Sequence, residues 1–391
     1  MDWPAGVIWV IDRLTDAGYE AYAVGGCVRD WLLKRAPVDW DVATCARPDQ
    51  VRAALDGARV IETGIKHGTL TAIYGGQAVE VTTFRADGAY TDHRRPDEVR
   101  FVSSLRADLS RRDFTINAMA MKPGGAPIDY FGGRADLAAR AVRAVGRPET
   151  RFAEDALRIL RALRFAAQLD FTVEPATARA LHDMRSELKH VSAERIYSEL
   201  KRLLVGPGTA RVLLGFPEVL AEAAPFGFYD ARLVGRLPED AVLRLAVMMR
   251  GGDVRLGLRK LRADNAATGR AELLAALSKR PTPGDARGAL TLLRAAGGTE
   301  AARDALAIWR AEGRDVDEAQ ELVEALIRQN ACYRLSDLKV NGRDLIALGV
   351  PRGPALGSTL EALLDRVMAG ETPNERKALL EAARGMKLGM G

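Results

Sequence analysis

Cysteine is scarce in this chain of 391 residues, with three widely separated positions and no Cys-x-x-Cys pair. That spacing argues against a disulfide framework or a structural zinc site, and it indicates a reduced, cytoplasmic compartment. Uncharged apolar runs are short, and none approaches the roughly 18 residues of a membrane-spanning helix. The opening segment, MDWPAGVIWVIDRL, carries two aspartates and too short an apolar stretch for a signal peptide. We therefore expect a soluble protein without a membrane anchor.

What the chain does have is the balance of a globular protein, with 48% hydrophobic and 28% charged residues. Its length allows two or three domains, and its net charge of +5 permits a polyanionic partner without proving one. Up to about residue 140, short β-like runs alternate with turns, and beyond Gly146 the pattern becomes helical. We predict strands at 22–24, 41–43, 69–74 and 78–83, and helices at 7–17, 28–33 and 48–54. The fold class is therefore α+β, with an all-helical region after an N-terminal α+β domain.

The first candidate site is the sequence GGCVRD at residues 25–30, where a strand is expected to turn into a helix. Glycine lets backbone N–H groups approach phosphates closely, and the start of a helix favours anions. Gly26 and Arg29 are therefore candidate contacts to a triphosphate. Taken alone, the same sequence also fits a tight turn with no functional role.

Two aspartates follow in the sequence DWDVAT at residues 39–44. Residues two apart in a strand share a face, so the carboxylates of Asp39 and Asp41 are expected to converge. Such a pair suits Mg²⁺, and two-metal phosphoryl transfer needs one. Glu80, on a neighbouring strand, is a candidate third carboxylate. A lone Asp-x-Asp is more often a solvated turn, but its place after a Gly-Gly turn favours the metal site.

A third cluster is the sequence RRDFTINAMA at residues 111–120. The guanidinium of Arg112 suits a phosphate, and the carboxylate of Asp113 suits the hydroxyls of a ribose. The alternative, without a role in nucleotide binding, is a surface charge cluster at the start of a helix.

The fourth cluster is the sequence EDALRILRALRF at residues 154–165, for which we predict one continuous helix. Helical spacing gathers its apolar side chains on one face, namely Phe152, Ala156, Ile159, Leu160 and Leu163. The opposite side carries Glu154, Arg158 and Arg161, bordered by Asp155 and Arg164. Glu154 and Arg158 are four residues apart and are expected to hold each other in place. The alternative is a solvated helix face with ordinary ion pairs.

Taken together and in this order, the four clusters resemble class II tRNA nucleotidyltransferases, the bacterial CCA-adding enzymes and their poly(A) polymerase relatives. Further similarity lies at residues 63–69, 129–137 and 191–196. The resemblance is strong from residue 20 to about 205 and weak beyond. It implies a palm of polymerase-β type followed by a helical neck, body and tail, with domains at 1–140, 141–215 and 216–391.

The resemblance also implies an enzyme that adds C, C and A to the 3′ end of tRNA from CTP and ATP, using Mg²⁺ and no nucleic-acid template. It implies that Asp39 and Asp41 hold metal, that Gly26, Arg29 and Arg112 contact the triphosphate, and that Asp113 contacts the ribose. It further implies that the nucleotide pocket is lined by Asp155, Arg158, Arg161 and Arg164, and that Glu154 orients Arg158. A poly(A) polymerase, an enzyme adding part of the CCA end and an inactive RNA-binding module stay open as alternatives, as does the oligomeric state.

The segment 85–100 is polar, contains an Asp-Gly pair and a proline, and reads as a mobile loop. A pocket that accepts cytosine twice and then the larger adenine has to change shape between additions. This loop is a candidate for the segment that changes the shape of the pocket. The family resemblance supports this role, because enzymes that stop after CC resemble this family but lack such a loop. We expect deletion of residues 89–96 to spare CC addition and to reduce A addition steeply, as read from the lengths of labelled tRNA products. Equal loss of both steps would indicate a folding defect, and normal A addition a passive connection.

Overall fold

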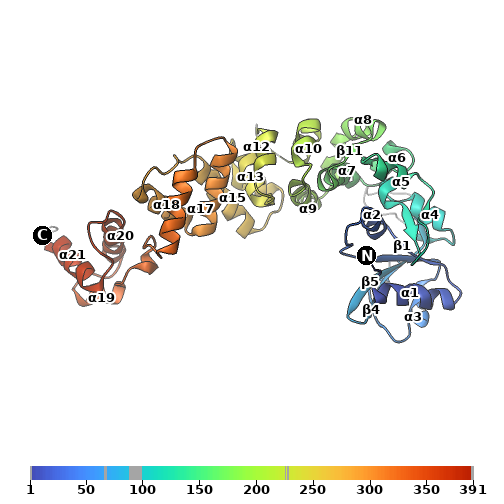
Figure 1. Ribbon diagram of the computed structural model, residues 1–391, viewed down its shortest axis with the longest axis horizontal. Helices are drawn as coiled ribbons and strands as arrows, with labels where there is room; N and C mark the ends of the chain where they lie inside the picture. The colour runs from blue at the N-terminus through green and yellow to red at the C-terminus, as the bar shows by residue number, and fades with distance from the viewer. Residues whose placement is uncertain (1, 66–67, 88–98, 225, 227–228, 389–391) are drawn as a thin grey trace. The chain divides into compact units, whose positions relative to one another are not determined.

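The computed structural model describes residues 2–65, 68–87, 99–224, 226 and 229–388. The chain divides into two units, 1–225 and 226–391, which are described separately (Figure 1). In the part of the chain that the structure describes, no helix is long and apolar enough to cross a membrane. The segment 89–96, whose deletion is predicted to affect A addition, lies outside the described residues.

A seven-stranded mixed sheet is the centre of the first unit. Its order is β3 (Arg59–Gly64), β4 (Thr69–Tyr74), β5 (Gln77–Thr83), β2 (Asp41–Thr44), β1 (Ala21–Val24), β8 (Met119–Met121) and β9 (Ile128–Asp129). Neighbouring strands are antiparallel except β2 and β5, which run parallel with Asp41 opposite Glu80. The four predicted strands are confirmed to within one residue at each end.

Helices pack against this sheet and close its hydrophobic core. The helix α1 (Ala5–Asp16) lies against β1, β2, β4 and β5 and buries Val10 and Leu14 completely. The short helix α4 (Leu105–Ser110) packs against the sheet face that carries Val24 and Ala43. Because side chains alternate along a strand, Asp41 lies on the same face as Ala43. The sheet thus places Asp41 on the side of α4, whose end leads into the sequence RRDFTINAMA.

The remaining elements of the first unit are mostly short helices. They are α2 (Gly26–Leu32), α3 (Pro48–Ala54), the 3₁₀ turn η2 (Thr115–Asn117), α5 (Gly133–Ala138), α6 (Pro148–Glu154), α7 (Leu157–Leu169), α8 (Pro175–Asp183), the 3₁₀ helix η3 (Arg185–His190), α9 (Ala193–Leu204), α10 (Thr209–Gly215) and α11 (Pro217–Ala223). Two small sheets pair β6 (Arg85–Asp87) with β7 (Val99–Phe101) and β10 (Ala141–Val142) with β11 (Thr172–Val173). The predicted helices at 7–17, 28–33 and 48–54 correspond to α1, α2 and α3.

The described residues of the second unit form helices joined by turns and loops, without a strand. Its helices are α12 (Ala231–Arg236), α13 (Ala241–Met249), α14 (Val254–Lys260), α15 (Asn265–Ser278), α16 (Ala286–Ala296), α17 (Thr299–Ala311), α18 (Asp317–Arg328), the 3₁₀ turn η4 (Leu335–Asp337), α19 (Gly342–Ala347), α20 (Pro354–Met368) and α21 (Arg376–Leu388). One core cluster is built around the buried Trp309, whose indole N–H donates to the carbonyl of Ser278. A second cluster surrounds Leu345 and Leu363. The α+β class with a helical second part, predicted from the sequence, is confirmed.

The prediction of one continuous helix over 154–165 is wrong. The helix α6 ends at Glu154, and Asp155 has an extended backbone (φ −147°, ψ 103°) before α7 begins at Leu157. The carboxylate of Asp155 accepts a hydrogen bond from the N–H of Leu157 at 3.1 Å, which satisfies a donor at the start of α7. An aspartate in the capping role therefore starts a second helix where periodicity alone suggested continuity.

Candidate functional site: carboxylates beside an arginine pocket

The turn between β1 and α2 needs a glycine at its first position. Gly25 has a φ of 81°, in the left-handed region, and a Cβ there would lie 2.8 Å from a terminal nitrogen of Arg112. Gly26 follows as the first residue of α2. The sequence interpretation named Gly26 as the functional glycine, whereas Gly25 is the one that lets Arg112 approach the turn.

The acidic residues gather where β2 begins. Asp41 and Glu80 are register partners on parallel strands and so face the same side of the sheet. Burial raises the pKa of Asp41, the charges of Glu80 and Asp39 raise it further, and Arg112 opposes them. Asp39 is exposed and lies in the bend before β2, so the expectation that a shared strand aligns both aspartates is wrong. The two carboxylates are nevertheless close enough to repel each other.

The donor set fits a hard divalent cation that shares its ligands with a substrate. Among the described residues, no group of three or more His, Cys, Asp or Glu side chains could hold a metal ion by itself. Mg²⁺ typically binds through one or two carboxylates and takes its other ligands from phosphates and water. Asp39 and Asp41, crowded by Glu80, are a donor set of that kind.

A pocket of about 310 Å³ lies next to the end of α4, and we call it the arginine pocket. It is lined by Arg111, Arg112, Asp113, Asp155, Leu157, Arg158, Arg161 and Arg195. Five arginines against two aspartates give the lining a positive charge, which favours an anionic ligand. The Nε of Arg112 is buried and has no hydrogen-bond partner among the described residues. A buried donor of this kind is normally satisfied, so a ligand that brings acceptors fits here.

Asp113 and Arg161 form the firmest pair in the arginine pocket. Arg161 donates to one carboxylate oxygen through Nη2 at 2.6 Å and Nε at 2.8 Å, and the N–H of Phe114 and the amide of Asn117 donate to the other. Burial alone would raise the pKa of Asp113, but the charge and hydrogen bonds of Arg161 lower it to about 2. Both oxygens of Asp113 are engaged by protein donors, so this side chain holds Arg161 in place.

We expect Arg161→Met to destabilise the first unit by about 2 kcal/mol or more at pH 7, because it leaves the buried Asp113 charge unpaired. A carboxylate with a lowered pKa stabilises the fold above its ordinary pKa of about 3.9 and loses that effect as the pH falls toward the folded value of about 2. The difference between variant and wild type in the free energy of urea unfolding should therefore shrink as the pH falls toward 2.

The matched control for this prediction is Arg140→Met, which removes an exposed partner of Asp170. Surface pairs of this kind contribute less than about 1 kcal/mol, so the control should differ little from wild type at any pH. A loss of stability in Arg161→Met that does not change with pH would show that Asp113 is not the group responsible.

Asp155 occupies the break between α6 and α7 and meets a partner from a distant part of the chain. Its second carboxylate oxygen accepts a hydrogen bond from Nη2 of Arg195 at 2.8 Å. Arg195 belongs to α9, in the segment 191–196 that carried part of the family resemblance, but no role was assigned to it from the sequence. The structure thus adds Arg195, Arg111 and Leu157 to the lining residues that sequence reasoning named.

The pair formed by Glu154 and Arg158 was predicted and is confirmed. Nη1 of Arg158 lies 2.6 Å from an oxygen of Glu154, whose other oxygen lies 2.7 Å from Arg151. Arg158 also donates to the backbone carbonyls of Arg151 and Arg111, each at 3.2 Å. These contacts fix the plane of the Arg158 guanidinium at the wall of the arginine pocket.

Three of the predicted nucleotide contacts, Gly26, Arg29 and Arg164, are not among the lining residues of the arginine pocket. Arg164 is buried, lies 2.8 Å from Glu199 and stacks 4.1 Å above the ring of Phe165. Burial lowers the pKa of Arg164 to about 10. Glu199 on α9 thus holds the Arg164 side chain, and a contact of Arg164 with the nucleotide stays a prediction.

Arg29 is held from two sides. Its guanidinium donates to both oxygens of Asp30, at 2.9 and 3.0 Å, and its Nη1 donates to Asn117 at 2.8 Å. It also lies 5.2 Å from the centre of the Phe165 ring. Arg29 thus connects α2 to the turn that follows Asp113, beside the arginine pocket and not within its lining.

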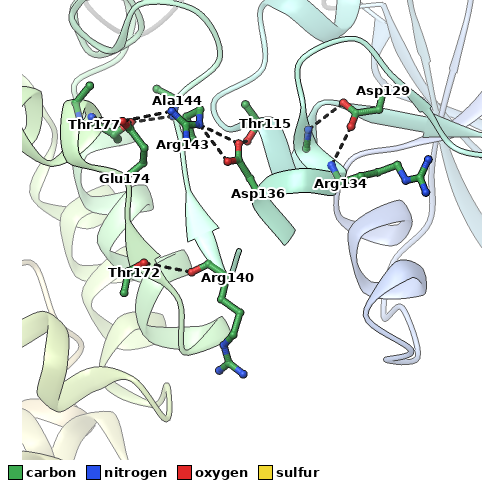
Figure 2. Close-up of polar contacts among 12 residues, drawn as sticks. Thr115, Asp129, Arg134, Asp136, Arg140, Arg143, Ala144, Thr172, Glu174 and Thr177 are labelled. Carbon is green, nitrogen blue, oxygen red and sulfur yellow. Dashed lines mark hydrogen bonds and ion pairs between the residues drawn. The ribbon is translucent and has the colours of Figure 1, made fainter. Parts of the chain in front are cut away.

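A second polar network anchors the turn η2, which carries Thr115 and Asn117 (Figure 2). The hydroxyl of Thr115 donates to the buried Asp136 at 2.6 Å, and Arg143 donates to the same carboxylate at 3.1 Å. Arg143 also lies 3.3 Å from Glu174, whose carboxylate caps α8. The turn behind the arginine pocket is therefore tied through charged contacts to the helices that follow the sheet.

A mixed sheet with acidic residues at the start of β2, a glycine turn and an adjoining basic pocket fit the head domain of a nucleotidyltransferase, and the family models that match the chain assign it to that class. The family model for the poly(A) polymerase head domain matches residues 21–143. A model for an RNA- and SrmB-binding site of polymerase A matches residues 170–215, and a model for tRNA nucleotidyltransferase domain 2 matches residues 239–383.

Full-length relatives identify the family more narrowly. The chain is 36% identical to the CCA-adding enzyme of Limosilactobacillus fermentum over 386 residues, which covers 96% of this chain and 95% of the relative. It is also 36% identical to the CCA-adding enzyme of Bacillus subtilis over 390 residues, with 95% and 96% covered. The chain belongs to the CCA-adding enzyme family.

Solved structures agree with this assignment. The crystal structure of the Bacillus stearothermophilus CCA-adding enzyme in complex with CTP matches 100% of this chain and 99% of its own, with a TM-score of 0.83 and 33% identity. The Thermotoga maritima CCA-adding enzyme complexed with tRNA_CCA matches with a TM-score of 0.68 at 22% identity, over 97% of this chain and 94% of its own, and shows a shared fold.

Proposed function

We propose that this enzyme adds C, C and A to the 3′ end of tRNA from CTP and ATP, without a nucleic-acid template, by metal-assisted phosphoryl transfer. The observation that carries the proposal is the arginine pocket, whose positively charged lining includes both the carboxylate of Asp155 and the guanidinium of Arg158. The family membership, the CTP complex of the related Bacillus stearothermophilus enzyme and the matched tRNA nucleotidyltransferase domain support it.

The chemistry divides between two places in the first unit. Asp39 and Asp41 would hold Mg²⁺, with Glu80 adding negative charge beside them. Bound there, Mg²⁺ would lower the pKa of the attacking 3′-hydroxyl and neutralise charge on the leaving pyrophosphate. Arg112 lies against the glycine turn and connects the two places. Its charge acts on Asp41 in the carboxylate cluster, and its side chain lines the arginine pocket.

The base would be chosen by Asp155 and Arg158. Cytosine presents an amino donor at N4 next to an acceptor at N3, and adenine presents N6 and N1 in the same relation. An ionised Asp155 only accepts and Arg158 only donates, so the pair suits both bases. Uracil and guanine present a donor and an acceptor in the reverse order, and each reversed contact costs roughly 1–3 kcal/mol. The protein itself then acts as the template.

Supporting contacts would hold the side chains of Asp155 and Arg158 in position. Glu154 fixes Arg158 at 2.6 Å, and Arg195 holds Asp155 at 2.8 Å. Arg111 and Arg161 would contact the triphosphate. A contact between Asp113 and the ribose, and contacts of Gly26 and Arg29 with the triphosphate, stay predictions. The same holds for the domain bounds 1–140, 141–215 and 216–391, in which the last part grips tRNA.

Incubation with Mg²⁺, CTP, ATP and one of two RNA acceptors would test the proposal. A tRNA that ends at its discriminator base should gain three nucleotides and then stop, whereas an unstructured RNA of the same 3′ sequence should gain few. Long adenosine tails on either RNA would contradict the proposal and indicate a poly(A) polymerase. Termination after two cytidines would indicate an enzyme that builds only part of the CCA end.

A further inference from the structure

Three of the five tryptophans gather next to the acidic bend. The ring of Trp3 lies 4.7 Å from that of Trp40 and 5.7 Å from that of Trp31, and the rings of Trp31 and Trp40 are 6.2 Å apart. All three pairs are tilted or edge-to-face, the arrangements in which aromatic rings attract. We call these residues the tryptophan cluster.

Each ring of the tryptophan cluster comes from a different segment of the first unit. Trp31 lies on α2, the helix that begins at the glycine turn. Trp40 is the residue between Asp39 and Asp41. Trp3 precedes α1 and belongs to no helix or strand. The ring of Trp3 therefore contacts both the acidic bend, through Trp40, and the helix of the glycine turn, through Trp31.

Trp40 is the only described side chain of the bend 38–40 that is buried, with 9% of its surface exposed. Asp39 is exposed, and Val38 is 92% exposed. The carbonyl of Trp40 accepts a hydrogen bond from the N–H of Glu80 at 3.3 Å, which ties the backbone of the bend to β5. Because neighbouring side chains of an extended chain point to opposite sides, the burial of Trp40 on one side turns Asp41 to the other.

The carboxylates need an outside restraint of this kind. Asp39, Asp41 and Glu80 carry like charges in one small region, and repulsion between them favours any movement of the bend that separates them. Asp39 lies before the first ladder residue of β2, so the strand does not hold it. The hydrogen bond from Glu80 to the Trp40 carbonyl and the packing of the Trp40 ring against Trp31 and Trp3 both oppose this movement.

We propose that Trp3 is a positioning residue for the metal-binding carboxylates, acting through the ring of Trp40. This inference rests on the proposed function in one respect, namely that Asp39 and Asp41 hold a divalent cation. Removal of the Trp3 ring takes away the nearer of the two tryptophan rings that contact Trp40, so the bend gains freedom to adopt arrangements in which the two carboxylates are too far apart for one ion. The consequence is a weaker metal site in a folded protein.

The test is the affinity of the full chain for Mn²⁺ alone, measured from the electron paramagnetic resonance signal of the free ion. We expect Trp3→Ala to weaken Mn²⁺ binding by about tenfold, the effect typical of losing a group that supports metal ligands. The Mg²⁺ concentration for half-maximal CMP addition should rise in parallel, while turnover at saturating Mg²⁺ stays near that of wild type. Trp3→Phe keeps an aromatic ring at this position and should restore both values.

Two further variants separate the possible outcomes. Trp9→Ala removes a tryptophan of α1 that stacks on Tyr74 at 4.0 Å, outside the tryptophan cluster, and should leave the Mn²⁺ affinity unchanged. Equal weakening in Trp9→Ala and Trp3→Ala, or unchanged affinity in Trp3→Ala, would overturn the inference. Asp41→Asn tests the metal site itself: if it binds Mn²⁺ as wild type does, the proposed function has failed. Loss of binding in Asp41→Asn with normal binding in Trp3→Ala would overturn only the role of Trp3.

Discussion

Replacing Asp41 by alanine is expected to reduce nucleotide addition by roughly a thousandfold or more, because a metal-bound carboxylate contributes several kcal/mol to the transition state of phosphoryl transfer. The same result is expected for Asp39→Ala. Neither change should unfold the protein, because each removes one of several carboxylates that repel one another. Single-turnover CMP addition to a tRNA lacking its CCA end measures the first effect, and far-UV circular dichroism with a thermal midpoint measures the second.

The matched control is Asp56→Ala, which removes an exposed carboxylate elsewhere in the same unit. Its turnover and thermal midpoint should match those of wild type. Near-normal turnover in Asp39→Ala or Asp41→Ala at any Mg²⁺ concentration would remove these residues from the metal site. A large fall in the thermal midpoint would mean instead that the carboxylates serve the fold, and the loss of activity would then say little about the chemistry.

The second large effect concerns the choice of base. Arg158→Ala and Asp155→Ala should each lower kcat/KM for CTP and ATP and bring it closer to the values for UTP and GTP. Each change removes a favourable contact with cytosine and adenine together with the mismatched contact that excludes uracil and guanine. Two reversed contacts support discrimination on the order of 10²–10⁴-fold in the wild type, and most of that factor should vanish. The measurement is kcat/KM for single addition of each of the four nucleotides to a tRNA acceptor.

Variants of the supporting residues make this test sharper. Arg195→Ala should reduce the preference for CTP and ATP less than Asp155→Ala does, since it removes one of two hydrogen bonds to the Asp155 carboxylate and keeps the carboxylate itself. Arg134→Ala, on an exposed side chain of α5, should leave selectivity unchanged. If UTP and GTP stay as strongly excluded in Arg158→Ala as in wild type, the base is read somewhere else in the arginine pocket.

The strands and the position of the acidic cluster could be predicted from the sequence because they depend on local pattern. Runs such as 69–74 and 78–83 have the composition of strands and are separated by a Gly-Gly turn, so their lengths follow from neighbouring residues alone. The pair formed by Glu154 and Arg158 was predictable for the same reason: it needs only a spacing of four residues across a helical turn.

What the sequence did not reveal depends on contacts between distant segments. Apolar spacing continues in phase across the break at Asp155, with Phe152, Ile159 and Leu163 all fully buried, so periodicity gave no sign of an interruption. The local signal was Asp155 itself, because an aspartate side chain readily accepts a hydrogen bond from the backbone N–H two residues further on. The pairing of Asp155 with Arg195 spans 40 residues and has no local signal.

The most direct test of the central claim, that a pocket of the protein selects the added bases, is one reaction with all four nucleotides at equal concentration. The substrate is a tRNA ending at its discriminator base, with Mg²⁺ and no other nucleic acid, and the 3′ ends are sequenced after completion. The account predicts that nearly all extended ends read CCA and grow no further. Ends that contain U or G, or that continue as runs of A, would contradict it.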